Sequence, residues 1–232
     1  MAFRFRQFSL EDDQSSMRIG TDAVLLGSWI NPENTSGILD IGTGCGIIAL
    51  MMAQKCNAAI TAIDIDEDSA LQAAGNFRNS PWNERMKALH IPIQDFVKHH
   101  EDKFDMIISN PPYFSNSLRS PDKSRNIARH DDQLNAHELL AGVTRIISSK
   151  GKFCLILPSD DAKSFLEQAK AHNLFLIRQL LVKSKPDAKP KRIAMEFSFS
   201  YPRLVITDEI IIRKEDNSLT EAYRELTRDF YL

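Results

Sequence analysis

The tetrapeptide Asn110-Pro111-Pro112-Tyr113 contains the residue types that are most specific for a chemical role. It follows the apolar run 104–109, which is typical of a buried strand. Two consecutive prolines fix the backbone and remove two N–H donors, and they push Asn110 towards an extended conformation. The side-chain oxygen of Asn110 and the carbonyl of Pro111 are then two fixed acceptors, which suit a group with two N–H donors. The alternative is a proline-terminated strand whose Tyr113 packs in the core.

A glycine-rich turn precedes this tetrapeptide in the chain. Three of the nine glycines, Gly42, Gly44 and Gly46, stand between a strand-like run and a helical pattern. Such a turn directs backbone N–H groups and the positive end of a helix at a ligand, with no Cβ atoms to block the approach. Asp64 ends the next strand-like run, where such folds bind ribose hydroxyls. A dinucleotide pattern needs glycine where this chain has Ile47, so a dinucleotide site is disfavoured. A tight turn that binds nothing is the other alternative.

Strand-like and helical segments alternate around these residues. Five short apolar runs are expected to form strands: 37–41, 59–64, 86–93, 104–109 and 153–157. Helical patterns are found at 47–55, 67–78, 136–151 and 159–172. Asp66 and Asn135 are the expected N-caps of the second and third of these helices. Near-continuous apolar strands between helices indicate a mostly parallel sheet that is covered on both faces.

The last part of the chain has a different pattern. Residues 193–201 and 204–212 are adjacent strand-like runs around Pro202, with no room between them for a crossover helix. We therefore expect these two runs to pair antiparallel to each other. Ser218, three residues before a glutamate, is expected to open a final amphipathic helix. Residues 183–192 have the composition of a linker.

The composition excludes several classes of protein. The chain has 232 residues, of which 43% are hydrophobic and 26% charged, and a formal net charge of −2. These values are typical of a folded globular protein and not of a disordered or a globally basic one. No apolar run approaches the roughly 20 residues of a membrane span, and the first residues lack a secretory signal pattern. The three cysteines are scattered, so no disulfide framework or zinc site is indicated, and we expect a cytoplasmic location.

The glycine turn and Asp40, two residues before it, resemble the first motif (D-x-G-x-G-x-G) of S-adenosylmethionine-dependent methyltransferases. The resemblance implies that S-adenosylmethionine is the cofactor and that no metal is needed. It implies that Asp40 and the turn hold the methionine end and that Asp64 holds the ribose. It also implies that Asp95 binds the adenine edge. Taken alone, Asp95 would be a helix cap or a loop acid.

The tetrapeptide resembles the Asn-Pro-Pro-Tyr motif of methyltransferases that modify planar amino groups. By this resemblance, Asn110 and Pro111 hold the two N–H donors of an exocyclic amine and favour the charge that develops on its nitrogen. Pro112 keeps the backbone rigid, and Tyr113 stacks on the flipped base, a contact worth roughly 1–3 kcal/mol. We expect these four residues to form the catalytic group, with Asn110 at the cofactor as well.

The run 17–26 resembles the segment that covers the cofactor in small RNA-modifying methyltransferases. Three further stretches point to one family: 79–85, 128–131 and 219–232. Together with the motifs above, they resemble the bacterial methyltransferases that modify adenine N6 beside the anticodon of tRNA1(Val). The resemblance covers nearly the whole chain. It implies that the run 17–26 covers the cofactor, with Thr21 and Asp22 in contact with it. Taken alone, this run would be an amphipathic helix.

Two segments rich in lysine and arginine could follow the phosphates of an RNA partner. One begins at Arg119, soon after the tetrapeptide, and the other ends at Arg192. The alternative for both is a solvated loop. The residues that we expect at the RNA are Arg119, Lys123, Arg125, Arg129, Lys189, Lys191 and Arg192.

These observations predict an α/β fold with a Rossmann-like seven-stranded methyltransferase sheet, mostly parallel, with a C-terminal antiparallel pair and helices on both faces. We expect one domain over 1–232, divided into a cofactor-covering segment (1–36), a cofactor-binding core (37–175), and C-terminal strands and a helix that contact RNA (176–232). The expected reaction is methylation of adenine N6, at position 37, in tRNA(Val), with no membrane and no obligate protein partner. Methylation of adenine N6 or guanine N2 in ribosomal RNA, methylation of a release-factor glutamine, and a silent RNA-binding platform are the alternatives.

Overall fold

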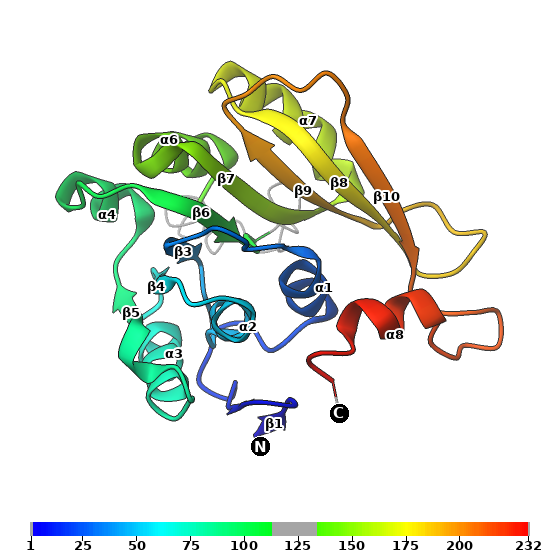
Figure 1. Ribbon diagram of the computed structural model, residues 1–232, viewed down its shortest axis with the longest axis horizontal. Coiled ribbons are helices and arrows are strands. Elements are labelled where there is room, and N and C mark those ends of the chain that lie inside the picture. Colours follow the sequence, from blue (N-terminus) through cyan, green and yellow to red (C-terminus); the bar gives the residue numbers. More distant parts are fainter. Residues whose placement is uncertain (1, 113–133, 232) are drawn as a thin grey trace, which may run out of the picture.

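A twisted sheet forms the centre of the computed structural model, which describes residues 2–112 and 134–231 (Figure 1). Its strands are β3 (Gly37–Ile41), β4 (Ala59–Asp64), β5 (Met86–His90), β6 (Phe104–Ser109), β7 (Ile147–Pro158), β8 (Phe175–Lys183), β9 (Arg192–Ser198) and β10 (Ile206–Ile211). Within the described residues their order is β10-β8-β9-β7-β6-β3-β4-β5. Two short strands near the N-terminus, β1 (Phe3–Arg4) and β2 (Ser9–Leu10), pair separately and antiparallel.

Helices cover both faces of this sheet (Figure 1). One layer contains α1 (Thr21–Trp29), α2 (Ile47–Lys55), α3 (Glu67–Arg78) and α8 (Glu221–Thr227), and the other contains α4 (Ile93–His99), α6 (Ala136–Ile146) and α7 (Ser159–Ala171). A short 3-10 helix, η1 (Asn83–Arg85), precedes β5. No helix in the described part of the chain is long and apolar enough to cross a membrane.

Each face of the sheet has its own hydrophobic core. Successive side chains of a strand point to opposite faces, and β3 shows this alternation clearly. Ile38 belongs to the core shared with α1 and α2, whereas Leu39 belongs to the core shared with α4, α6 and α7. The near-continuous apolar strands seen in the sequence are therefore explained by burial on both faces.

The predicted α/β class, mostly parallel with an antiparallel component and helices on both faces, is confirmed. The pairing predicted for residues 193–201 and 204–212 is wrong. Strand β9 lies between β7 and β8 and is antiparallel to both, whereas β10 pairs parallel with β8. The seven strands from β5 to β8 in spatial order are thus extended by an eighth, β10, at the edge.

Strand β8 is the element that the sequence pattern concealed. Arg178 and Gln179 interrupt its apolar run, and most of its residues are only half buried. Because the sequence pattern does not reveal β8, it predicts that the next two runs pair with each other. The linker-like stretch 183–192 contains the end of β8, the start of β9 and the connection between these antiparallel strands, residues 184–191.

Several element boundaries differ from those predicted. The N-caps Asp66 and Asn135 are confirmed, the latter with a complete capping box. Strand β5 ends at His90, and α6 ends five residues before Gly151, since residues 147–158 extend β7. Thr220 rather than Ser218 caps the final helix, through a hydrogen bond from the Tyr223 N–H at 3.2 Å.

The segment between β2 and α1 lies against α3 and reaches the carboxyl ends of the central strands. Three polar side chains of α3, Ser69, Gln72 and Asn76, accept hydrogen bonds from backbone N–H groups of residues 11–16 at 2.7–3.1 Å. The start of the chain is tied to its end, because the Arg6 N–H donates to the Phe230 carbonyl at 2.9 Å. These bonds position the N-terminal segment beside the site described next.

Candidate active site

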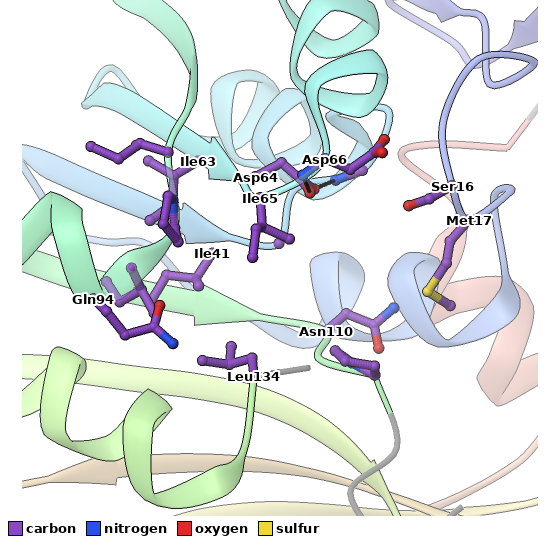
Figure 2. A pocket seen from close by; sticks show the side chains of 16 residues that line it. Ser16, Met17, Ile41, Ile63, Asp64, Ile65, Asp66, Gln94, Asn110 and Leu134 are labelled. Carbon is purple, nitrogen blue, oxygen red and sulfur yellow. Dashed lines mark hydrogen bonds between the residues drawn. The ribbon is translucent and has the colours of Figure 1, made fainter. Parts of the chain in front are cut away.

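Two adjoining cavities, each of about 290 Å³, lie at the carboxyl ends of β3, β4 and β6. Ligands of open α/β sheets bind at this edge. We call the first the Asp64 cavity; it is lined by Ser16, Met17, Ile41, Gly42, Gly44, Ile63, Asp64, Ile65, Asp66, Ile91, Pro92, Ile93, Gln94, Asn110, Pro112 and Leu134 (Figure 2). We call the second the Asp22 cavity; it is lined by residues 17–23, 42–45, 47 and 48, and by Asn110 and Arg192. Because Met17, Gly42, Gly44 and Asn110 line both, one elongated ligand could occupy the two cavities together.

The three glycines of the turn have positive φ angles of 69°, 56° and 86°, which glycine adopts without a steric penalty. A Cβ atom added to Gly42 would meet no atom within 4 Å, so it would project into open space, and Gly42 lines both cavities. A Cβ atom on Gly46 would lie 2.5 Å from Cε1 of Phe77. Gly42 therefore keeps the cavity open, whereas Gly46 allows α2 and α3 to pack closely.

The backbone N–H groups of the turn are used inside the protein. Those of Gly42 and Thr43 donate to the Ile63 carbonyl at 2.9 and 3.1 Å, and that of Gly46 donates to the Thr43 carbonyl at 2.9 Å. The Gly44 N–H donates to Oδ2 of Asp64 at 2.8 Å. The sequence predicted that these N–H groups point at a ligand, and for these four residues the structure corrects that prediction. A bound anion could use these four N–H groups only if the bonds that fix the turn were weakened.

Asp64 stands at the end of β4 in the wall of the cavity named after it. Its Oδ2 accepts the Gly44 N–H, and its Oδ1 accepts the Asp66 N–H at 3.0 Å. Burial raises the pKa of this carboxyl above its ordinary value, although the backbone hydrogen bonds oppose the rise. Each carboxylate oxygen can accept more than one hydrogen bond, so Asp64 can hold ligand hydroxyls while it fixes the turn.

Asp40 lies beneath the turn and is fully buried. Its Oδ2 accepts the Thr43 hydroxyl at 2.7 Å, and its Oδ1 has no hydrogen-bond partner among the described residues. Burial raises the pKa of Asp40 to about 7, against the opposing effect of the Thr43 hydrogen bond. Asp40 is not among the residues that line either cavity. It therefore acts on the turn through Thr43.

Asn110 directly follows β6 and belongs to the walls of both cavities. Figure 2 shows its side chain near Met17, which comes from the N-terminal segment. Pro111 is buried and Pro112 is exposed at the rim. The end of β6 is fixed to β3, because the buried Ser109 hydroxyl donates to the Ile41 carbonyl at 2.9 Å. The amide of Asn110 thus lies where the two cavities meet.

The structure brings some other predicted cofactor residues together and leaves one apart. Thr21 and Asp22 begin α1 and line the Asp22 cavity. Asp95 lies in the first turn of α4, where its carboxylate forms an ion pair with Lys98 at 2.7 Å, and it is not a lining residue. The hydrogen bond to Lys98 lowers the pKa of Asp95. Gln94, one residue earlier, lines the Asp64 cavity instead.

The predicted RNA-binding residues are divided by the structure. Tyr113 of the tetrapeptide and four of the basic residues lie outside the described residues: Arg119, Lys123, Arg125 and Arg129. Lys189 and Lys191 are exposed on the connection between β8 and β9. Strand β8 runs in the same direction as β7 and β6, because β9 is antiparallel to both β7 and β8. This connection therefore lies at the same sheet edge as the cavities.

Arg192 was expected at RNA but lines the Asp22 cavity. Its Nε donates to Oδ2 of Asp22 at 2.7 Å, and its Nη1 donates to the Lys191 carbonyl at 3.0 Å. Sequence reasoning also missed Ser16, Met17, Gln94 and Leu134 as wall residues. The position of Gln94 beside Asp95 was a usable signal, whereas nothing in the sequence relates Arg192 to a helix start 170 residues away.

Two further observations concern the side chains at the site. Cys45 lines the Asp22 cavity, but burial raises the pKa of its thiol to about 12, so it is not a thiolate nucleophile at neutral pH. Within residues 2–112 and 134–231, no three His, Cys, Asp or Glu side chains form a group that could hold a metal ion. The polar side chains in the cavity walls carry carboxylate, amide, hydroxyl and guanidinium groups, and apolar side chains lie beside them.

Comparisons with known proteins agree with this geometry. The family model of the methyltransferase small domain matches residues 14–160. The chain is 44% identical to the tRNA1(Val) (adenine(37)-N6)-methyltransferase of Phocaeicola vulgatus, over 99% of this chain and 97% of that protein. It is 43% identical to the protein of the same name from Bacteroides fragilis, with the same coverage. The fold is similar to that of a predicted O-methyltransferase from Agrobacterium tumefaciens, with a TM-score of 0.71 and 18% identity over 90% of this chain and 96% of that one.

Proposed function

The chain belongs to the methyltransferase small domain family, and from this premise we propose that it methylates N6 of adenine 37 in tRNA1(Val), with S-adenosylmethionine as the methyl donor. The names of relatives at 37–44% identity over nearly the full chain support the substrate. The position of Asn110 is the observation that supports this reaction type. Its amide lies in the wall shared by the two cavities and is followed by two prolines.

The residues present fit S-adenosylmethionine. Gly42 leaves open space where a Cβ atom would stand, and it lines both cavities. The Asp64 cavity combines one carboxylate, which suits ribose hydroxyls, with isoleucine side chains, which suit the apolar faces of adenine. The Asp22 cavity offers charged groups to the amino-acid end. When bound, S-adenosylmethionine supplies an electrophilic methyl group on a positively charged sulfur.

We propose that Asn110 and Pro111 hold the exocyclic amine of the target adenine. The nitrogen lone pair of this amine is delocalised into the ring, so the amine is a poor nucleophile. Its two N–H groups match two acceptors, the Asn110 side-chain oxygen and the Pro111 carbonyl. Such acceptors orient the nitrogen and stabilise the positive charge that develops on it during attack. They hold the N–H protons until one is lost to solvent.

The prolines explain why these acceptors are well placed. Pro111 fixes its own φ angle and restricts Asn110, so little conformational freedom is lost when the amine binds. The Ser109 hydrogen bond to Ile41 fixes the strand end from which both residues extend. The expected stacking of Tyr113 on the base is part of this proposal, although that residue lies outside the described part of the chain.

We propose that the RNA approaches along the carboxyl edge of the sheet. Lys189 and Lys191 are exposed at this edge, beside the Asp22 cavity. A flipped base can enter the site while such side chains contact the phosphates on either side. Binding should then weaken steeply with salt, because each phosphate contact releases a counterion. A release-factor protein as substrate would give a weak dependence on salt.

The direct test is transfer of a tritiated methyl group from S-adenosylmethionine into total tRNA from a strain that lacks the gene. The labelled nucleoside is identified by mass spectrometry, and the labelled tRNA by hybrid selection. We expect N6-methyladenosine in the valine tRNA. Absence of label from the tRNA, with the cofactor still bound, would overturn the proposed substrate; ribosomal RNA and a release factor would then be tested as acceptors in the same assay. The Asn110→Ala variant, which should bind the cofactor without transferring the methyl group, is the control for contaminating enzymes.

A further inference from the structure

We propose that Arg192 binds the carboxylate of the cofactor's amino-acid end, with Asp22 holding the guanidinium in place and binding the ammonium group. Arg192 would thereby make the protein selective for ligands that carry this carboxylate. The inference rests on the proposed function, since it concerns the cofactor of that reaction. It assigns to Arg192 a role different from the RNA contact that the sequence predicted.

The first argument is that the glycine turn has few donors to offer. The N–H groups of Gly42, Thr43, Gly44 and Gly46 all donate to acceptors within the protein. A carboxylate that enters the Asp22 cavity loses water and needs compensating hydrogen bonds, preferably from a cation. Two guanidinium groups belong to the wall of this cavity, those of Arg18 and Arg192.

The second argument is that Arg192 is better fixed than Arg18. Arg192 is the first residue of β9, and its backbone is paired with Pro158 of β7 and Val182 of β8. Its side chain is 28% exposed, and it is held by the hydrogen bonds to Asp22 and to the Lys191 carbonyl. Arg18 is exposed and belongs to no helix or strand. A guanidinium that is already fixed loses less conformational freedom when it binds a ligand.

The third argument is the charge pattern of the pair. The Asp22 carboxylate and the Arg192 guanidinium are 2.7 Å apart and both line the cavity. An α-amino acid presents an ammonium and a carboxylate that are separated by one carbon atom. A guanidinium has five N–H donors in a planar fork, so it can donate to a protein carboxylate through Nε and to further acceptors through its two Nη groups. The pair is therefore complementary to a zwitterion.

The test compares two ligands that differ only in this carboxylate, S-adenosylmethionine and its decarboxylated form. Isothermal titration calorimetry on the full chain gives the Kd of each ligand without any methyl transfer. The variants are Arg192→Gln, Arg18→Gln, and Lys185→Gln as a matched control. Lys185 lies on the same β8–β9 connection but lines neither cavity.

We expect Arg192→Gln to weaken binding of S-adenosylmethionine roughly 10- to 100-fold, the range for a lost charge-assisted hydrogen bond. Binding of the decarboxylated ligand should change less than about threefold, within the ordinary effect of a surface substitution. Arg192→Lys should recover part of the preference because it restores the charge without the fork. Lys185→Gln should bind both ligands as the wild type does.

Two results would overturn the inference. Equal weakening of both ligands by Arg192→Gln would mean that the residue only supports the cavity wall. Loss of the preference in Arg18→Gln but not in Arg192→Gln would assign the carboxylate to Arg18. Failure of the wild type to bind either ligand would instead refute the proposed function, so the two failures are distinguishable.

Discussion

Replacement of Asp64 by asparagine tests the role of this side chain in both the glycine turn and the ligand site. The two carboxylate oxygens each accept one backbone N–H, that of Gly44 at 2.8 Å and that of Asp66 at 3.0 Å. Asparagine has the same shape but only one oxygen. In either orientation its amide N–H₂ faces one of the two backbone donors, which is then left without an acceptor.

The expected magnitude follows from this single loss. A buried donor without an acceptor costs about 1–3 kcal/mol. Burial raises the pKa of Asp64, which means that the buried charge is itself unfavourable, and its removal offsets part of this cost. We therefore expect the free energy of unfolding to fall by about 1–2 kcal/mol. In a chain of 232 residues, 1 kcal/mol lowers Tm by about 2–4 °C. The Tm should therefore fall by about 2–8 °C, and the affinity for S-adenosylhomocysteine by about 10-fold.

The assay is thermal unfolding followed by circular dichroism, together with calorimetric titration of S-adenosylhomocysteine. Asp66→Asn is the matched control, because Asp66 lines the same cavity and, among the described residues, accepts hydrogen bonds through Oδ1 alone, from the N–H and the hydroxyl of Ser69. Asparagine is as good an N-cap as aspartate, so this variant should stay within about 2 °C of the wild type. Equal effects of the two variants, or an unchanged Tm in Asp64→Asn, would refute the reasoning.

Three other predictions concern Asn110, the two glycines Gly42 and Gly46, and Asp40. Asn110→Ala should reduce methyl transfer at saturating cofactor by about 100- to 1,000-fold and leave the Kd of S-adenosylhomocysteine within about threefold; comparable losses in both would assign Asn110 to the cofactor wall alone. Gly46→Ala should destabilise the protein by about 2–5 kcal/mol in urea unfolding, because of its positive φ and the contact with Phe77. Gly42→Ala, at a positive φ but in open space, should cost only about 1–2 kcal/mol and should chiefly weaken cofactor binding; equal destabilisation by the two would contradict this distinction. The pKa of Asp40 is raised from 3.8 to about 7, so the folded state keeps a proton that the unfolded state loses, and stability should fall as the pH rises through this interval. The fall in Tm from pH 5 to pH 8 should be smaller in Asp40→Asn than in the wild type. If Tm falls equally with pH in both proteins, the raised pKa of Asp40 is not the cause of the fall.

The parts of the site that could be predicted from the sequence depend on local pattern. The glycine turn, Asp64 and Asn110 each end or follow a short apolar strand, and parallel strands bring their carboxyl ends to one edge of a sheet. Their placement in the cavity wall follows from this rule. The details of bonding do not, because the destination of the turn's N–H groups depends on how β4 packs beside β3.

The parts that could not be predicted depend on contacts between distant segments. Strand β8 is half buried and includes Arg178 and Gln179, so its pattern of apolar residues does not identify it as a strand. Without it, the order of the last strands cannot be derived. Arg192 was grouped with the neighbouring lysines by composition, whereas its position at the start of β9 places it in the cavity. Charge alone does not distinguish a residue that lines a cavity from one that faces solvent.

The pairing of Asp22 with Arg192 has a consequence for folding during synthesis. The ribosome makes these two residues 170 positions apart, and the partner of Arg6, Phe230, comes later still. A nascent chain that stops before β9 contains the glycine turn and Asp64 but lacks one wall of the Asp22 cavity. A ligand that binds only the complete site stabilises only chains that have passed this point. The cofactor would thus favour completed chains over truncated ones, and this selection requires no contact with RNA.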